Sequence, residues 1–258
     1  MRRNSPVLRD GVLMSVGTLT VLPVAAPSVV NRRVAAVAMV LAPLAALPLA
    51  GVAVLAVLAG TWLGLPPFVT AVAAIGAVAF GSRGLHLDGL ADVADGLAAS
   101  YDRDRALAVM RRGDVGPSGV VTLVLVLLGQ VAALAGAVTA GVGVPAVAAA
   151  VLAGRAVLPL CCVRGVPSAR PDGLGAAVAG TVPPWVAGAL VSGGLLACAV
   201  VPGIAWWHGF LAPVLGWACA AVLLAHAVRR FGGLTGDVLG ACVELTTVVV
   251  LVVLSVPA

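Results

Sequence analysis

Four long stretches of the chain carry no Asp, Glu, Lys or Arg: residues 34–82, 115–154, 173–228 and 245–258. A helix needs about 20 apolar residues to cross the hydrocarbon core of a bilayer. Inside a bilayer the backbone must satisfy its own hydrogen bonds, so only helices and closed barrels cross it. The stretches show no alternation with a period of two residues, which barrel strands require. The pattern therefore predicts an all-α, polytopic membrane helix bundle.

Glycine and proline interrupt these stretches and divide them into about seven transmembrane helices. The interruptions fall near Gly64-Leu65-Pro66-Pro67, Gly141-Val142-Gly143 and Pro202-Gly203. The expected spans are 34–59, 67–82, 119–140, 144–163, 184–201, 205–228 and 241–257. We expect them to form a single integral-membrane domain over residues 1–258, with helices also in the loops.

Composition excludes the other broad classes of protein. Hydrophobic residues make up 62% of the chain and charged residues only 10%, whereas soluble domains have about 25% charged residues. A soluble enzyme, a disordered chain, a coiled coil and a disulfide scaffold are all inconsistent with these values. The net charge of +5 comes from Arg clusters, which fit membrane loops better than a nucleic-acid surface. The five Cys lie in apolar runs without a CxxC motif, so we expect buried, unpaired thiols.

The distribution of arginine predicts a topology. The breaks at 60–66, 141–143 and 202–204 contain no Arg, whereas every other connection between spans contains Arg. Basic loops face the cytoplasm, so we expect a multi-pass protein whose Arg-bearing connections lie on the cytoplasmic side of the membrane. Trp62, Trp206 and Trp207 would then lie at the opposite boundary as interfacial anchors. The uncharged segment 11–31 is rich in Ser, Thr and Pro, which favours an interfacial or re-entrant helix on the cytoplasmic face.

An acidic cluster is the clearest candidate for a functional site, because six of the ten acidic residues lie between positions 88 and 114. Asp88, Asp92 and Asp95 are spaced i, i+4 and i+7, which places them on one face of a helix. This face is either solvated or holds a cation. Carboxylate oxygens suit Mg²⁺, and the absence of Cys or a second His nearby argues against zinc. His86 lies beside the row and could be a base or a donor to phosphate.

Other charged residues each have a structural and a functional interpretation. Asp102 can cap a helix that runs to about Arg112 and ends at Gly113. Arg111 would then either stabilise the C-terminus of that helix or bind phosphate. Arg155 lies near the middle of the fourth expected span, which indicates either a functional group or an ion pair with an Asp.

A glycine-rich segment near the end of the chain, residues 229–244, forms a second candidate site. A turn with Asp237 as the helix N-cap explains that residue, but it explains Thr235 and the Arg229-Arg230 pair less well. Glu244 is the only Glu in the chain and follows two helical turns later. An ionisable side chain inside a span is not expected to face lipid.

At His86-Leu-Asp88-Gly-Leu-Ala-Asp92-Val-Ala-Asp95-Gly96 the chain resembles the cobalamin synthase family, the adenosylcobinamide-GDP ribazoletransferases. The resemblance continues in the expected order at 19–24, 102–116, 154–155, 169–175 and 232–244. It therefore covers nearly the whole chain, and the motifs at 86–96 and 232–244 are specific.

The resemblance implies a Mg²⁺-dependent reaction in the cytoplasmic membrane. Adenosylcobinamide-GDP and α-ribazole, or α-ribazole 5′-phosphate, would give adenosylcobalamin, or its 5′-phosphate, and GMP. The implied catalytic residues are Asp88, Asp92, Asp95 and His86, of which the three Asp would hold the metal, and the implied substrate-binding residues are Arg111, Arg155, Arg170, Thr235 and Asp237.

Two other functions are considered against this one. A CDP-alcohol phosphotransferase also uses Asp-held Mg²⁺, but this chain lacks the spacing of that signature. A cation-coupled transporter would place acids at mid-span in broken helices with an internal repeat. In this sequence the acids cluster in one connection flanked by Arg, and there is no internal repeat. The sequence leaves open the number of Mg²⁺ ions, the general base, the lower base that is accepted, and whether the protein is a homo-oligomer.

Overall fold

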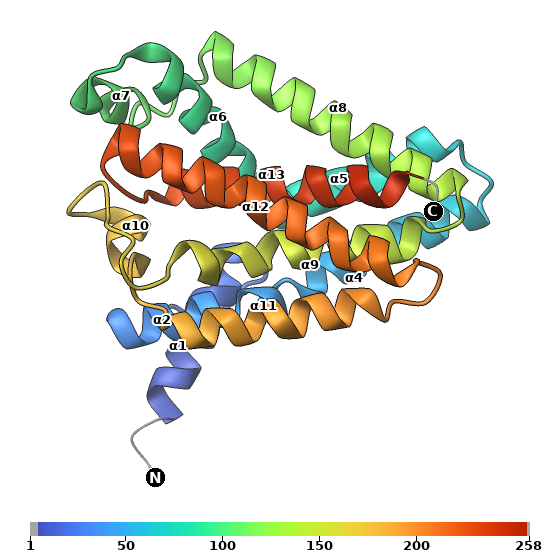
Figure 1. Ribbon diagram of the computed structural model, residues 1–258, viewed down its shortest axis with the longest axis horizontal. Coiled ribbons are helices and arrows are strands. Elements are labelled where there is room, and N and C mark those ends of the chain that lie inside the picture. Colours follow the sequence, from blue (N-terminus) through green and yellow to red (C-terminus); the bar gives the residue numbers. More distant parts are fainter. Residues whose placement is uncertain (1–4, 257–258) are drawn as a thin grey trace.

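The computed structural model describes residues 5–256 and confirms an all-helical architecture, with two isolated β-bridges and no strand in that range. The helices are α1 (Ser5–Leu19), α2 (Arg32–Val40), α3 (Ala42–Ala45), α4 (Leu47–Trp62), α5 (Pro67–Gly81), α6 (Leu85–Ala99), α7 (Arg103–Val109), α8 (Pro117–Thr139), α9 (Gly143–Cys161), α10 (Gly173–Val178), α11 (Pro184–Ala199), α12 (Trp206–Phe231) and α13 (Gly236–Ser255). The long helices lie side by side along the longest axis of the molecule (Figure 1). Helix α13 is central, because it packs against α6, α8, α9 and α12.

Each expected span coincides with helical structure, which confirms a polytopic helical membrane protein. Helices α8, α9, α12 and α13 are long and apolar enough to cross a bilayer. Helices α5 and α6 would qualify together, but the chain bends by 88° between them. The acidic row lies on α6, which is therefore a loop helix, and α5 is apolar but has only 15 residues. Helices α4 and α11 are apolar but have only 16 residues each.

The expectation of one continuous helix over 34–59 is wrong. The structure divides this range into α2, α3 and α4, with Pro43 and Pro48 in the first turns of α3 and α4. Proline lacks a backbone N–H and fits a first turn, where that donor would be unpaired anyway. The two prolines therefore favour new helix starts within the segment.

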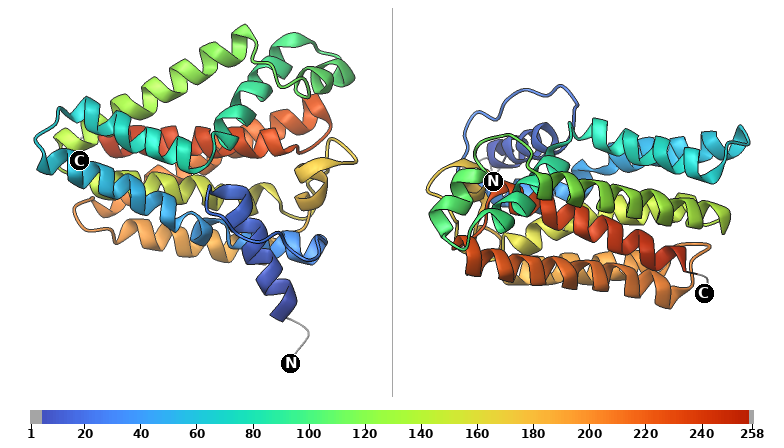
Figure 2. Two further views of the ribbon diagram at one scale, coloured as in Figure 1. Left: turned by 180° about the vertical axis from the view of Figure 1, so that it is seen from behind. Right: turned by 90° about the horizontal axis from the view of Figure 1, so that it is seen from above.

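The N-terminal segment is helical only in its first part. Helix α1 runs crosswise to the long helices and packs against α2 and α3 (Figures 1 and 2). Residues 20–31 are irregular, so the expected helix over 11–31 is confirmed only as far as Leu19. The buried Asp10 carboxylate accepts hydrogen bonds from the Ser28 hydroxyl and the Val29 N–H. The bonds from Ser28 hold the pKa of Asp10 below its usual value and tie the irregular segment to α1.

The connections are sorted between the two ends of the bundle. The three Arg-free connections, α4–α5, α8–α9 and α11–α12, lie together at one end with the last turn of α13 (Figures 1 and 2). Helices α7 and α10 lie at the other end. The expected interfacial anchors Trp62 and Trp206, which border two of the Arg-free connections, are strongly exposed. This arrangement agrees with the sorting of charge that the sequence predicts.

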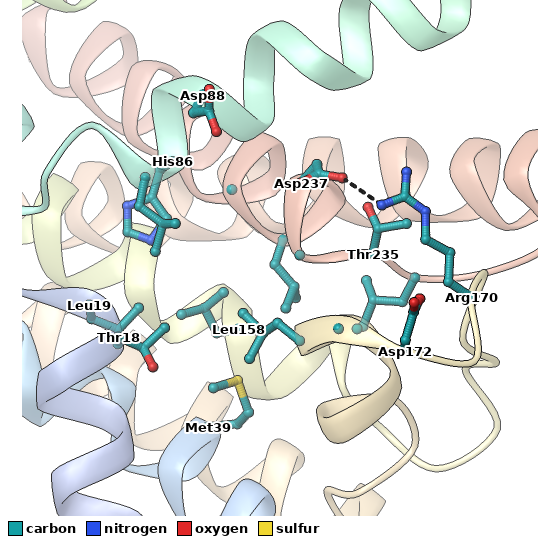
Figure 3. Close-up of a pocket in the computed structure, with 18 residues that line it drawn as sticks. Thr18, Leu19, Met39, His86, Asp88, Leu158, Arg170, Asp172, Thr235 and Asp237 are labelled. Carbon is teal, nitrogen blue, oxygen red and sulfur yellow. Dashed lines mark ion pairs between the residues drawn. The ribbon is translucent and has the colours of Figure 1, made fainter. Parts of the chain in front are cut away.

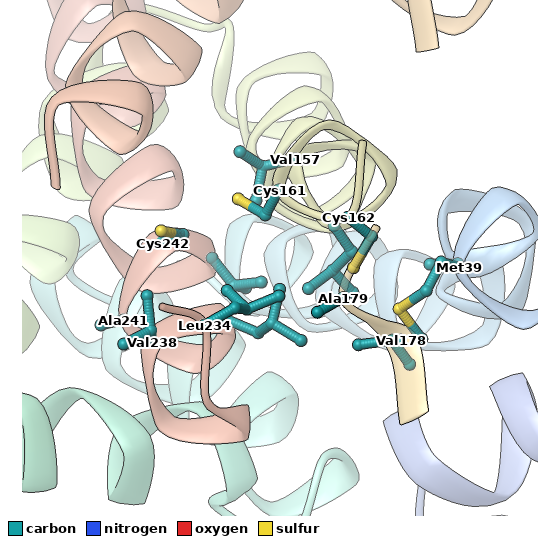
Figure 4. Packing of buried hydrophobic residues seen from close by; sticks show 14 of the residues in the cluster. Met39, Val157, Cys161, Cys162, Val178, Ala179, Leu234, Val238, Ala241 and Cys242 are labelled. Carbon is teal, nitrogen blue, oxygen red and sulfur yellow. The ribbon is translucent and has the colours of Figure 1, made fainter. Parts of the chain in front are cut away.

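The cysteines are unpaired as expected, but only three of the five are buried. All five thiols are free, with Cys161, Cys162 and Cys242 buried and the other two half-buried. The three buried thiols contribute to the apolar core that α9 and α13 share, close to Leu234 (Figure 4). They pack there as small hydrophobic side chains.

Candidate active site

A cavity of about 290 Å³ lies where the first turns of α6 and α13 meet the loop before α10. One wall is apolar and is formed by Leu19, Met39 and Leu158 (Figure 3). The polar side chains that line it are Thr18, His86, Asp88, Arg170, Asp172, Thr235 and Asp237. The cavity thus joins the acidic motif to the C-terminal motif, which are far apart in the sequence.

Two glycines allow α6 and α13 to approach closely enough to form this cavity. A Cβ placed on Gly89 would lie 2.7 Å from the carbonyl oxygen of Asp237, and a Cβ on Gly240 would lie 3.0 Å from the Cα of His86. The turn before α6 uses Arg83 and Gly84, both with positive φ. Glycine adopts this conformation at little cost. Because the two backbones are in close contact, Asp88 and Asp237 line the same cavity.

The start of α13 is fixed by Thr235 and not by Asp237, so the interpretation of Asp237 as the N-cap is wrong. The Thr235 hydroxyl accepts a hydrogen bond from the Val238 N–H (3.2 Å). Asp237 is the second residue of the helix, where the helix dipole stabilises a negative charge. One Arg170 nitrogen lies 3.8 Å from an Asp237 oxygen, and another donates to the carbonyl of Leu107 (2.9 Å).

The three aspartates of the acidic row have different environments. Asp88 lines the cavity. Asp92 is buried, and this burial, together with the charges of Asp88, Asp237 and Asp95, raises the pKa of its carboxyl to about 6. Asp95 points to the start of α8 instead, where its oxygens accept hydrogen bonds from the N–H groups of Gly116 (2.7 Å) and Gly119 (2.8 Å).

The expected metal triad is therefore not assembled as a cage in the structure. Among residues 5–256, no group of three or more His, Cys, Asp or Glu side chains is close enough to hold a metal ion. Asp95 serves as a cap for the N-terminus of α8, a role typical of Asp. Asp88 and Asp92 remain near each other and near Asp237.

The expected substrate-binding arginines divide into three cases. Arg170 reaches the cavity. Arg111 does not line it; its side chain is half exposed and forms an ion pair with Asp172 (2.8 Å) at the surface. Arg155 is fully buried beside His86, with 3.3 Å between its Nη2 and the Nδ1 of His86. The alternative of an ion pair between Arg155 and an Asp is not found in the described part of the chain.

Other expectations for charged residues are confirmed. Asp102 caps α7, because its carboxylate accepts a hydrogen bond from the Arg105 N–H (2.8 Å), although the helix ends at Val109. Glu244 is buried and accepts a hydrogen bond from Gln130 (2.7 Å), so it does not face lipid.

Sequence reasoning missed two features of the cavity. Asp172 was not singled out, although it stands directly before the glycine-rich motif 173–175 and lines the cavity. Thr18 comes from α1, and no local pattern links this helix to the acidic row. The capping role of Asp95 also lacks a local signal, because its partners lie more than 20 residues further along the chain.

The fold and the cavity define an integral-membrane helical protein with an acid-lined site between two specific motifs. A family model described as cobalamin-5-phosphate synthase matches residues 11–255. The chain belongs to this family.

Several named relatives align with most of this chain and with most of their own length. A Nocardioides protein is 50% identical over 240 residues, which are 92% of this chain and 95% of the relative. A Frankia casuarinae protein is 39% identical over 254 residues, which are 92% and 91% of the two chains. A Pseudomonas paraeruginosa protein is 42% identical over 216 residues, which are 81% and 84%. All three are named adenosylcobinamide-GDP ribazoletransferase. No solved structure matches the chain.

Proposed function

We propose that this protein joins adenosylcobinamide-GDP to α-ribazole or α-ribazole 5′-phosphate in the cytoplasmic membrane and releases GMP. The names of the relatives support the reaction. The observation that carries the proposal is the cavity in which Asp88 of the acidic motif and Asp237 of the C-terminal motif meet. Such a reaction depends on charge neutralisation and on the position of its reactants more than on covalent catalysis by the protein.

We also propose that Mg²⁺ is the cofactor and that Asp88 and Asp237, which line the cavity, would hold it together with oxygens of the substrate diphosphate, with Asp92 as a neighbouring charge. Their oxygens are hard ligands of the kind that Mg²⁺ prefers. Oδ2 of Asp237 is buried and accepts no hydrogen bond within the described structure, and its ion-pair partner Arg170 is 3.8 Å away, so a lone pair of this oxygen remains for a cation. Asp95 is left out of this set because both of its oxygens bond to the backbone of α8.

In the reaction a ribose hydroxyl oxygen of the riboside would bond to the phosphorus next to cobinamide. The bond from that phosphorus to the oxygen that bridges the two phosphorus atoms would break, GMP would leave with the electron pair of this bond, and the hydroxyl proton would pass to the solvent. When bound, Mg²⁺ would neutralise charge on the diphosphate. Arg170 adds a positive charge at the cavity, and its bond to the Leu107 carbonyl holds the guanidinium in place. A guanidinium can bind two phosphate oxygens at once.

The experiment that tests this function uses purified protein in lipid nanodiscs with adenosylcobinamide-GDP and α-ribazole. We expect GMP and adenosylcobalamin in equal amounts, only when both substrates and Mg²⁺ are present. Two comparison assays test the alternatives. One offers a CDP-alcohol with a lipid acceptor, and the other measures cation flux down a gradient across vesicles. Turnover of the CDP-alcohol, or cation flux without GMP formation, would overturn the proposal.

A further inference from the structure

We propose that Arg155 is a positioning residue that keeps the proton of His86 on Nε2, so that His86 donates a hydrogen bond in the cavity and is not the general base. The role toward substrate rests on the proposed function, whereas the position of the proton does not. The inference explains why an arginine that does not reach the cavity is buried directly behind it.

The geometry defines which ring nitrogen carries the proton. The Nη2 atom of Arg155 lies 3.3 Å from the Nδ1 atom of His86, and both side chains are buried. A guanidinium has hydrogen-bond donors and no acceptor. The Nδ1 atom must therefore accept, which leaves the proton of the neutral ring on Nε2. No other hydrogen bond to this ring is present among the described residues.

Arg155 also borders a small void that it shares with Glu244. The void has a volume of about 10 Å³, and Gln130 lines it as well. A volume of about this size is enough for one water molecule. The Nε and Nη1 atoms of Arg155 are buried without partners in the described structure. One water in the void would satisfy these donors and link them to the Glu244 carboxylate, which Gln130 already orients (2.7 Å).

The consequence for the reaction concerns the remaining ring nitrogen. A general base needs a free lone pair, but the only lone pair of this tautomer lies on Nδ1 and is used by Arg155. His86 lines the cavity, so its Nε2–H can donate to a phosphate oxygen. A fixed donor of this kind stabilises negative charge that develops during the reaction.

The direct test is the ¹⁵N NMR spectrum of histidine-labelled protein in nanodiscs, in which the two neutral tautomers have distinct shifts. The signals of His86 are identified by their loss in His86→Gln, and His208 and His226 serve as internal controls. We expect His86 to be protonated on Nε2 only. In Arg155→Met the proton should distribute between the two nitrogens, whereas Arg155→Lys, which keeps a donor, should retain the original tautomer.

Protonation of Nδ1 in the unaltered protein would overturn the proposal, as would an Arg155→Met spectrum that is identical to it. If Arg155→Met does not fold, the spectra of the unaltered protein and of Arg155→Lys still decide the question. These spectra need no substrate, so a failure of the proposed reaction is distinguishable from a failure of this inference.

A second arm tests the donor role through activity. The amide nitrogen of Gln can replace Nε2, whereas that of Asn falls near Nδ1. We expect His86→Gln to retain a GMP release rate about tenfold higher than His86→Asn, as the loss of one hydrogen bond predicts. Equal and complete loss in both variants would indicate a base and contradict the proposal.

Discussion

Gly89 of α6 lies directly against the backbone of Asp237 in α13, with no room between them for a side chain. This contact sets the distance between the acidic motif and the C-terminal motif. The cavity depends on it, because Asp88 precedes Gly89 in the chain and shares the cavity lining with Asp237. A backbone atom cannot move aside as a flexible side chain can, so the position is sensitive to a single added carbon.

Gly89→Ala should therefore reduce GMP release more than it reduces the amount of folded protein. Overpacking at such a contact costs about 1–3 kcal/mol, and the two motifs would move apart. The matched control is Gly76→Ala in α5, where an added Cβ meets nothing within 4 Å. Initial rates and thermal unfolding in detergent are the measurements. Equal rates in the two variants would show that this contact does not define the site.

Asp95→Ala should lower stability, because it removes the acceptor for two N–H groups at the start of α8. Loss of a helix cap costs about 0.5–2 kcal/mol. Asp114→Ala, at an exposed position in the same connection, should leave the unfolding temperature unchanged. If Asp95→Asn instead abolished GMP release at normal stability, Asp95 would be a metal ligand as the sequence first indicated.

The fold could largely be predicted because helices that lie in lipid are formed by long stretches without charged residues. Uncharged stretches gave the positions of the long helices, and the Arg-free breaks are found together at one end. The division of 34–59 could have been read from Pro43 and Pro48, which favour helix starts. The turn before α6 was harder to predict from the sequence, because Arg83 adopts a positive φ that is uncommon for residues other than glycine.

The candidate site was predictable in its motifs but not in its contacts. Helical spacing correctly gave Asp88, Asp92 and Asp95 a common edge, yet spacing does not say which neighbour each residue meets. The packing of α6 decides that Asp95 accepts a hydrogen bond from the start of α8, whereas Asp88 lines the cavity. Arg155 was recognised as unusual within a span, but its contact with His86 is a tertiary feature.

Arg170→Lys should lower GMP release strongly, because lysine keeps the charge but loses the planar group that reaches both Leu107 and Asp237. Arg111→Lys is the control, since Arg111 pairs with Asp172 at an exposed position, where ion pairs contribute little. The ratio of the two rates is the readout. A larger effect at Arg111 would place substrate phosphate on the outer surface.

The sidedness of the site can be tested with single Cys probes in a background without the five native Cys. Probes near Gly64, Gly143 and Gly203 should react with an impermeant reagent from outside the cell. Probes near Arg103, Arg170 and Arg230 should react only after the membrane is opened, because the Arg-bearing connections are expected in the cytoplasm. Labelling of Arg103 or Arg230 positions from outside would contradict a cytoplasmic active site.

The most direct test of the account is GMP release by Asp88→Asn across a range of Mg²⁺ concentrations, compared with Asp102→Asn. Asp88 lines the cavity, whereas Asp102 only caps α7, and Asn caps a helix about as well as Asp. We predict that Asp88→Asn lowers the rate by about two orders of magnitude, at an unchanged yield of folded protein, and that Asp102→Asn leaves it near normal. A near-normal rate and an unchanged Mg²⁺ requirement in Asp88→Asn would show that the cavity between α6 and α13 is not the active site.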